Sequence, residues 1–171
     1  MARRTDFHRV IIGRSEMLTF VGTDLVNVPA KTDTGAYSSS VHASNIQLKD
    51  GVLSFELLGG HPNCGAISCK MQVTEFSEDL IKNSSGSGEM RYEVKLKVKL
   101  GPKIFFTRFT LADRSKMIYP VLLGRKLLNG RFIVDSAETS LDRVALKERY
   151  GVELPKDEDD EEDQNENSDI V

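Results

Sequence analysis

The chain has 171 residues, of which 39% are hydrophobic and 29% charged, and its formal net charge is −3. This is about the length of one domain with one packed core. No apolar run approaches the ~20 residues that span a bilayer, and the first residues have two arginines without an apolar stretch before a cleavage site. These features argue against a membrane protein and a secreted one, and we expect a soluble, cytoplasmic protein.

The charge is unevenly distributed along the chain. Nine acidic residues and no basic one lie between residues 157 and 171. Without these nine, 17 acidic residues stand against 23 lysines and arginines, a balance of about +6. The basic residues are dispersed and lack aromatic neighbours that could stack on bases. The pattern therefore argues against a nucleic-acid partner and is compatible with an acidic peptide substrate.

Short apolar runs between polar or glycine breaks predict a mainly β domain over residues 1–140. In chain order, the expected strands cover residues 8–12, 18–21, 25–30, 52–58, 66–76, 91–100, 104–111 and 132–134. Many short strands separated by turn residues favour a closed or sandwiched β domain. Residues 83–89, rich in serine and glycine, predict a flexible loop.

The clearest strand signal is the alternation over residues 91–100. Apolar residues would share one face and charged residues the other, as on a strand with one wet side. The apolar set is Tyr92, Val94, Leu96, Val98 and Leu100, and the charged set is Glu93, Lys95, Lys97 and Lys99. Gly101 and Pro102 then predict a turn, so that this strand and residues 104–111 form a hairpin.

Two helices and a tail are predicted toward the C-terminus. Residues 123–128 predict one short helix, closed by Asn129 and Gly130. Residues 141–153 predict another, ended by Gly151, because their apolar residues fall near helical spacing. Residues 154–171 predict a disordered acidic tail, because like charges repel and little apolar surface can be buried. A solubilising role is the favoured interpretation of the tail. Since its charge resembles that of an acidic substrate, inhibition of the cleft in cis or in trans is the alternative.

The two cysteines, Cys64 and Cys69, are near neighbours. A disulfide between them would close a very short loop that a chain of this size does not need, so we expect reduced thiols. A zinc site would need His61 as a further ligand, but this spacing matches no usual zinc arrangement and a fourth ligand is not evident. Neither a metal nor a cofactor is expected.

Asp33, Thr34, Gly35 and Ala36 follow an apolar strand and can carry aspartic protease chemistry. That chemistry holds a water between two carboxylates that share one proton, one acting as base and the other donating to the scissile carbonyl. Thr34 would brace the loop, and Gly35 would let the backbone approach the carboxylate. A chain with one such aspartate needs a twin chain for the second. By itself, however, Asp-Thr-Gly is also an ordinary turn sequence.

Four motifs, in order, resemble the RimK-associated retropepsin-like aspartic proteases, a family often labelled "ATP-dependent zinc protease". Residues 30–43, Ala-Lys-Thr-Asp-Thr-Gly-Ala-Tyr-Ser-Ser-Ser-Val-His-Ala, are similar to its Lys-Val-Asp-Thr-Gly-Ala-Arg-Thr-Ser-Ala-Leu-His-Ala segment. Residues 84–92 are similar to its Ser-Asn-Gly…Glu-x-Arg segment, and residues 111–117 to its Leu-Thr-Asp-Arg-x-x-Met. Residues 121–135, which begin Val-Leu-Leu-Gly-Arg, resemble its closing segment.

The resemblance implies an all-β, retropepsin-like closed barrel with one short helix after the Leu-Leu-Gly-Arg segment, active as a homodimer around a pair of Asp33 residues. Leu123, Gly124 and Arg125 would pack beneath the catalytic loop. It also implies an aspartic endopeptidase that cleaves α-glutamyl bonds in poly-α-glutamate or glutamate-tagged proteins. The zinc and ATP parts of the label lack support, because the sequence has neither His-Glu-x-x-His nor a phosphate-binding glycine loop.

Two departures from the family pattern lie beside the catalytic loop, where Tyr37 replaces a common arginine and Ser40 a common alanine. Candidate substrate contacts are Arg91, Lys31 and Tyr37. Arg91 can clamp a carboxylate with its two-pronged guanidinium or remain an exposed strand charge, and Lys31 can steer an anion. We expect Arg114 to have a structural role, pairing with a carboxylate such as Asp113 or Asp135, with substrate contact as the alternative.

Arg125 is also expected to be structural, and His42 to be packed or hydrogen-bonded rather than to act as a base. Residues 59–63 and 83–89 compete as the flap that closes over substrate, with the second preferred. Two rival functions stay open: a general endopeptidase without glutamate preference, and a catalytically silent retropepsin-like domain that binds partners.

Overall fold

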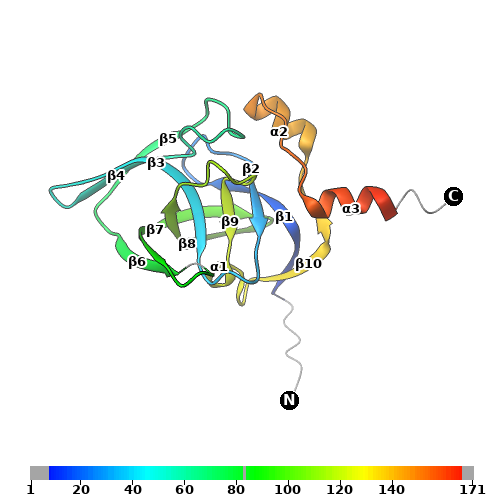
Figure 1. Ribbon diagram of the computed structural model, residues 1–171, viewed down its shortest axis with the longest axis horizontal. Coiled ribbons are helices and arrows are strands. Elements are labelled where there is room, and N and C mark those ends of the chain that lie inside the picture. Colours follow the sequence, from blue (N-terminus) through cyan, green and yellow to red (C-terminus); the bar gives the residue numbers. More distant parts are fainter. Residues whose placement is uncertain (1–7, 83, 167–171) are drawn as a thin grey trace, which may run out of the picture.

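The computed structural model describes residues 8–82 and 84–166 and contains ten strands and three helices (Figure 1). The strands are β1 (Val10–Phe20), β2 (Val28–Thr32), β3 (Ser39–Lys49), β4 (Val52–Leu57), β5 (Cys69–Val73), β6 (Ser77–Lys82), β7 (Gly88–Leu100), β8 (Lys103–Ala112), β9 (Val121–Leu123) and β10 (Phe132–Thr139). The helices are α1 (Arg125–Leu128), α2 (Arg143–Tyr150) and α3 (Glu158–Glu166).

Six strands close into a barrel, in the order β1-β2-β9-β3-β8-β7, and β7 pairs back with β1. The pairs β2–β9 and β3–β8 are parallel, and the other four pairs in the ring are antiparallel. Three extensions leave the ring: β10 on β1, β6 on β7, and β4 with β5 on β3. The predicted all-β closed barrel is therefore confirmed.

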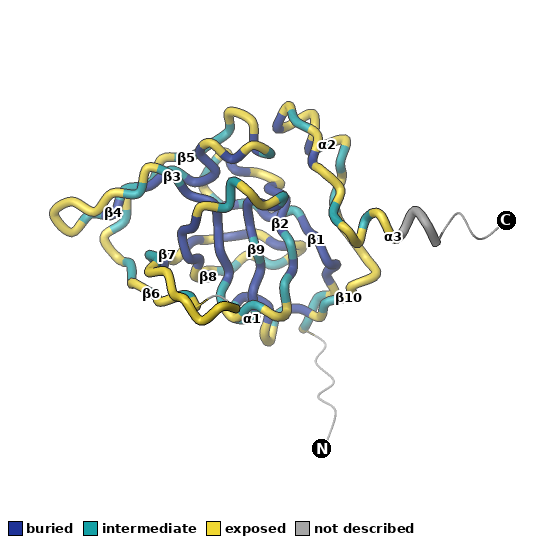
Figure 2. The backbone as a smooth tube through the Cα atoms, viewed as in Figure 1, coloured by how far each residue is buried: buried dark blue, intermediate teal, exposed yellow. Residues whose placement is uncertain are grey.

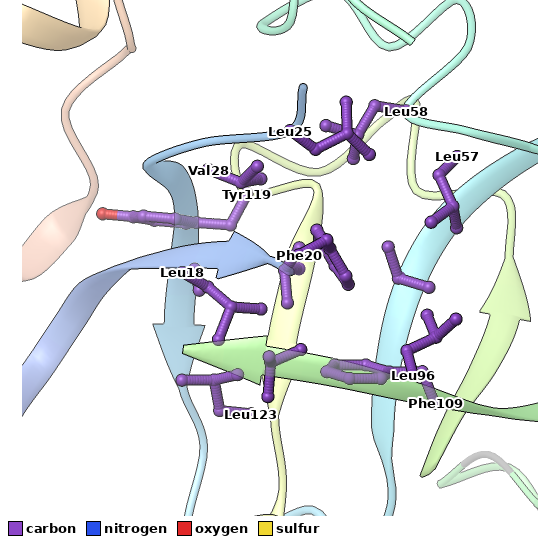
Figure 3. Close-up of a cluster of buried hydrophobic side chains, with 14 of the residues drawn as sticks. Leu18, Phe20, Leu25, Val28, Leu57, Leu58, Leu96, Phe109, Tyr119 and Leu123 are labelled. Atoms are coloured by element: carbon purple, nitrogen blue, oxygen red, sulfur yellow. The ribbon is translucent and has the colours of Figure 1, made fainter. Parts of the chain in front are cut away.

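The buried residues lie mainly on the strands of this barrel (Figure 2). Large apolar side chains from different strands meet there, and Phe20 and Phe109 pack with ring centroids 5.7 Å apart. Leu18, Leu25 and Leu123 belong to the same cluster and have no exposed surface (Figure 3). The core anchors both β2 and β9, the two strands that lead into the predicted catalytic segments.

The predicted alternation is present in β7, where Val94, Leu96 and Val98 are buried and the lysines between them are exposed. The hairpin to β8 is also present, with Leu100 opposite Lys103. Glu93 differs from the prediction, because its side chain is buried rather than exposed to solvent. Its carboxylate pairs with Lys126 of α1 at 3.3 Å, a contact that the strand pattern could not reveal.

The strand boundaries differ from the prediction at several places. Residues 10–12 and 18–20 of two predicted strands belong to one long strand, β1, and β3, β6 and β9 were not predicted as strands. β3 lacks an apolar signal because Ser39, Ser40 and His42 are polar and yet buried. These side chains make hydrogen bonds inside the fold, as described below.

Helices α1 and α2 lie within the ranges expected from the sequence. Asp142 caps α2 by accepting a hydrogen bond from Ala145, and Gly151 ends it with a φ of 70°, a conformation that favours glycine. Among the described residues, no helix is long and apolar enough to cross a bilayer.

Helix α3 occupies part of the segment predicted as a disordered tail. Acidic residues in its first turn suit the positive end of the helix dipole, and the Asp157 carboxylate accepts a hydrogen bond from the Asp160 N–H at 3.1 Å. The segment therefore has local helix-starting signals that its charge repulsion obscured. The end of the predicted tail, residues 167–171, lies outside the described residues.

Candidate active site

Asp33 is the first residue of a loop that connects β2 to β3, hereafter the Asp33 loop (residues 33–38). Parallel pairing of β2 with β9 places Thr32 beside Leu123, and the Asp33 N–H donates to the Leu123 carbonyl at 2.9 Å. The Thr32 hydroxyl donates to the Gly13 carbonyl on β1 at 2.9 Å. The aspartate thus follows a strand that is fixed from both sides.

The Asp33 carboxylate is oriented by its own loop. Its Oδ1 accepts hydrogen bonds from the N–H groups of Gly35 at 2.9 Å and Ala36 at 3.2 Å. A Cβ atom on Gly35 would lie 3.1 Å from the same oxygen, so glycine leaves room for this close approach. Thr34 is exposed, and the contact it makes with Arg125 uses its carbonyl.

Leu123, Gly124 and Arg125 support the Asp33 loop from the end of β9. The Gly124 N–H donates to the Ser39 hydroxyl at 2.9 Å, and a Cβ on Gly124 would lie 2.5 Å from the Ser38 carbonyl. The Arg125 guanidinium donates to the carbonyls of Thr34 at 3.1 Å and Gly35 at 2.9 Å. These contacts hold the backbone of the loop in one conformation.

A cavity of about 510 Å³, the site cavity, opens beside the Asp33 loop. Residues 35–38 of the loop and residues 79–82 of β6 line it, together with Ser40, Arg91, Thr110, Arg114, Leu122 and Lys126. Its volume is in the range of small-ligand sites. Four basic residues and one acidic residue line it: Lys82, Arg91, Arg114 and Lys126 against Asp79.

Two of the predicted substrate contacts line the site cavity. Arg91 does so while its guanidinium pairs with Glu89 on the same strand at 3.1 Å. Tyr37 is 61% exposed, and its ring lies against two cations, with Lys126 Nζ at 5.0 Å and Arg125 Cζ at 5.7 Å from the centroid. Such contacts hold the phenol ring at the rim of the cavity.

Lys31, the third predicted contact, is not brought to the site cavity. Its ammonium pairs with Asp157 and with Asp159 of α3, at 2.8 Å in each case. Burial alone would lower the pKa of Lys31, but the hydrogen bonds to these two carboxylates raise it. The same lysine lines a separate hollow between Ile118 and residues 157–162, hereafter the acidic segment.

Arg114 was expected to be structural, yet it lines the site cavity. Its Nε donates to the Tyr119 carbonyl at 3.0 Å, and its Nη1 donates to the Ser40 hydroxyl at 3.1 Å. Burial lowers its pKa to about 10, the charge of Arg91 acts in the same direction, and the charge of Asp33 opposes both. The guanidinium therefore stays charged at neutral pH. The Leu-Ala-Asp-Arg motif contained this residue but gave no sign of its position.

The two candidate flaps have different surroundings. The β6–β7 hairpin contributes residues 79–82 and Arg91 to the site cavity, whereas residue 83 at its turn lies outside the described residues. In the segment 59–63, Gly59 and His61 are buried, and the residues that line the site cavity do not include any of this segment. The hairpin is thus the element that borders the cavity.

The cysteines are both free thiols, and burial raises the pKa of Cys64 to about 12. Over residues 8–82 and 84–166, no group of three or more His, Cys, Asp or Glu side chains is placed to hold a metal ion.

Comparison with known proteins identifies the family. The family model described as "Retropepsin-like aspartic endopeptidase RimB" matches residues 11–144. A "Probable alpha-L-glutamate ligase" from Desulfotalea psychrophila is 35% identical over 162 residues, which are 90% of this chain and 34% of that protein. A protein of the same name from Shewanella pealeana is 31% identical over 159 residues, 87% of this chain and 34% of its own length. The chain thus spans about a third of these curated relatives.

A solved structure is similar in fold as well as in sequence. The crystal structure of a Legionella pneumophila protein described as having unknown function has a TM-score of 0.61 and 30% sequence identity. The match covers 76% of this chain and 95% of that one. With the match to residues 11–144 and the closed barrel around the Asp33 loop, this chain belongs to the RimB-like family of retropepsin-like aspartic endopeptidases.

Proposed function

We propose that this protein is an aspartic peptidase that works as a homodimer and cleaves α-glutamyl peptide bonds. The observation that carries the proposal is the Asp33 loop, where two backbone N–H groups orient one carboxylate and the end of β9 supports the loop. Each chain supplies one Asp33, so a second copy related by a two-fold axis would complete the catalytic pair.

In the proposed mechanism the two Asp33 carboxylates share one proton. The ionised carboxylate takes a proton from a bound water as that water attacks the scissile carbonyl, and the protonated one donates to the carbonyl oxygen. The bonds from Gly35 and Ala36 to Oδ1 leave Oδ2 for these transfers. Collapse of the tetrahedral intermediate then breaks the C–N bond, with proton transfer to the leaving amine.

Charge and relatedness both support a glutamate-rich substrate. The site cavity has more basic than acidic side chains, which would attract an anionic peptide. The longer relatives are named as α-L-glutamate ligases, and we infer that this chain acts on the same class of polymer that such a ligase makes. A cytoplasmic location would bring the peptidase and its substrate together.

The first test is mass spectrometry of oligo-α-glutamate incubated with the purified protein, beside an Asp33→Asn control. We expect shortened chains from the wild type only, and sedimentation analysis should show a dimer. Intact oligo-α-glutamate with both proteins would overturn the glutamate specificity. A monomer under conditions of turnover would contradict the shared aspartate pair.

A general endopeptidase is the second candidate, and the apolar side chains of the site cavity favour it. Leu80 and Leu122 both line the cavity, and Leu80 is 51% exposed. Neutral peptides with large apolar residues should then be cut at least as fast as oligo-α-glutamate. If neither substrate is cut, the catalytically silent binding domain becomes the better description.

A further inference from the structure

We infer that Arg114 is the carboxylate-binding residue of the site cavity, and that buried His42 and His61 are positioning residues that hold it there. The inference rests on the proposed function for the identity of the substrate, because it assigns which side chain would recognise a glutamate carboxylate. It also gives a role to two histidines that the proposed aspartic mechanism does not use.

Arg114 differs from Arg91 and Lys126 in having only neutral partners, and from Lys82 in being partly buried, since Lys82 is exposed. Arg91 pairs with Glu89 at 3.1 Å, and Lys126 pairs with Glu93 at 3.3 Å. The guanidinium of Arg114 donates to a carbonyl and a hydroxyl, and no described carboxylate pairs with it. Nη2 remains for a ligand, and a guanidinium fork suits a carboxylate.

The backbone of Arg114 is held on both sides by buried histidines. The Arg114 N–H donates to His42 Nδ1 at 2.9 Å, and the Arg114 carbonyl lies 3.0 Å from His61 Nε2. His42 is 3% exposed and His61 1% exposed, and their rings pack edge to face at 5.1 Å. Both peptide groups of the arginine are therefore fixed by a rigid pair of side chains.

The partners of each ring fix one neutral tautomer. His42 Nδ1 must be an acceptor because it faces an N–H, and Nε2 must carry the proton because it faces the Gly59 carbonyl at 2.9 Å. His61 has the same tautomer: Nδ1 accepts from the Asn63 N–H at 3.1 Å, and Nε2 donates to the Arg114 carbonyl. The two histidines thus contact Arg114 through opposite nitrogens.

This arrangement would reduce the cost of ordering Arg114 when substrate binds. A long charged side chain loses rotamer freedom on forming a new contact, but a side chain held at its backbone, Nε and Nη1 has already lost it. Ser40, which stands where the family commonly has alanine, supplies the Nη1 contact in this chain. The guanidinium is therefore pre-organised at the cavity wall, beside the Asp33 loop.

The carboxylate role is tested by binding, which does not need turnover. The full chain with Asp33→Asn is titrated with oligo-α-glutamate and with oligo-α-glutamine of equal length, which removes only the charge. We expect Arg114→Gln to weaken binding of the glutamate chain about 10- to 100-fold and the glutamine chain much less. Lys116→Gln, a matched loss of charge at an exposed position on the same turn, should change neither by more than about twofold.

The positioning role is tested by two substitutions at each histidine, one that keeps the hydrogen bond to Arg114 and one that removes it. Asparagine can replace Nδ1 of histidine and glutamine can replace Nε2, so each keeps one of the two hydrogen bonds. At position 42, His42→Asn keeps the contact to Arg114 and His42→Gln loses it. At position 61 the order is opposite, because His61→Gln keeps that contact and His61→Asn loses it.

We expect the variants that keep the Arg114 contact to bind oligo-α-glutamate more tightly than their counterparts, and KM to change more than kcat. Thermal unfolding of all four variants identifies those folded well enough to compare. If asparagine gave the tighter binding at both positions, or glutamine at both, the positioning role would be overturned. An Arg114→Gln affinity within twofold of the parent would overturn the carboxylate site, whether or not the wild type cleaves the polymer.

Discussion

Lys31 and Arg114 are both cations near the Asp33 strand, yet their surroundings are opposite. Lys31 lies between two carboxylates of the acidic segment, whereas Arg114 has only neutral hydrogen-bond partners and faces the site cavity. The first charge is neutralised within the fold and the second is available to a ligand. A basic residue close in sequence to a catalytic residue is therefore a weak guide to substrate binding.

The acidic segment neutralises further basic residues on the Lys31 side. Asp160 lies between Arg14 and Arg143, at 3.4 Å and 2.5 Å, and its side chain is 11% exposed. Helix α3 lies beside β10, whereas the β6 wall of the site cavity is on the opposite side of the barrel (Figure 1). These residues of the acidic segment thus bind cations other than those of the cavity within the same chain.

The largest expected effect is the loss of chemistry in Asp33→Asn. Turnover should fall by about 10²- to 10⁴-fold, because an amide cannot act as the base of the catalytic pair. Binding of oligo-α-glutamate should persist, because Arg114 is untouched. Turnover and affinity measured on the same preparation check this, and a variant that loses both equally would contradict the separate roles.

Acidification should weaken the Arg114 side of the fold first. Burial lowers the pKa of His61 from 6.5 to about 4. The unfolded chain therefore takes up this proton first, and stability is lost as the pH falls from about 6.5 to 4, by up to about 3 kcal/mol. Chemical denaturation across this range, with His61→Gln as reference, measures the difference.

The Lys31 side should fail in a lower pH window. Burial alone would raise the pKa of Asp157, but the hydrogen bond from Lys31 lowers it below 3.8. The contribution of this carboxylate to stability is therefore present above that value and is lost as the pH falls below it.

For the His61 prediction, the contrary result is a difference in unfolding free energy between wild type and His61→Gln that stays constant from pH 6.5 to 4. It would show that His61 is not buried in its neutral form.

Gly124→Ala should destabilise the support of the Asp33 loop by about 1–3 kcal/mol, because the new methyl group would overlap the Ser38 carbonyl. Turnover should fall with stability, since the loop backbone must move to make room. Denaturation and kinetics measure the two effects. Gly130→Ala is a useful reference: its φ of 78° is strained for alanine, but a Cβ there meets no atom within 4 Å, so activity should be kept.

Removal of the chain after Pro155 should have the smallest effect on turnover, because the ion pairs it removes, those of Lys31 and the more buried pairs of Asp160, lie away from the site cavity. The KM for oligo-α-glutamate should stay within twofold, and Lys31→Gln should behave alike. A clear fall in KM on truncation would mean that the acidic segment competes with substrate. It would also mean that the two sides of the molecule are not independent.

Much of the fold could be predicted because it depends on local patterns. The alternation in β7 separates buried from exposed positions, and Gly151 takes the left-handed conformation that ends α2. Polar but buried strands such as β3 were missed, because their stability comes from hydrogen bonds to distant residues. Helix α3 was missed because the prediction rested on the repulsion between like charges and did not consider that an aspartate could cap a helix there.

The sequence by itself determined the Asp33 loop and its family, because a tight turn and its glycine depend on consecutive residues. Only the tertiary structure decided which cations face the cavity. Arg114 meets His42 and His61 across 72 and 53 residues of chain, and Lys31 meets Asp157 across 126. Barrel closure sets these contacts, and a charge acts on substrate only where the fold leaves it without a carboxylate of its own.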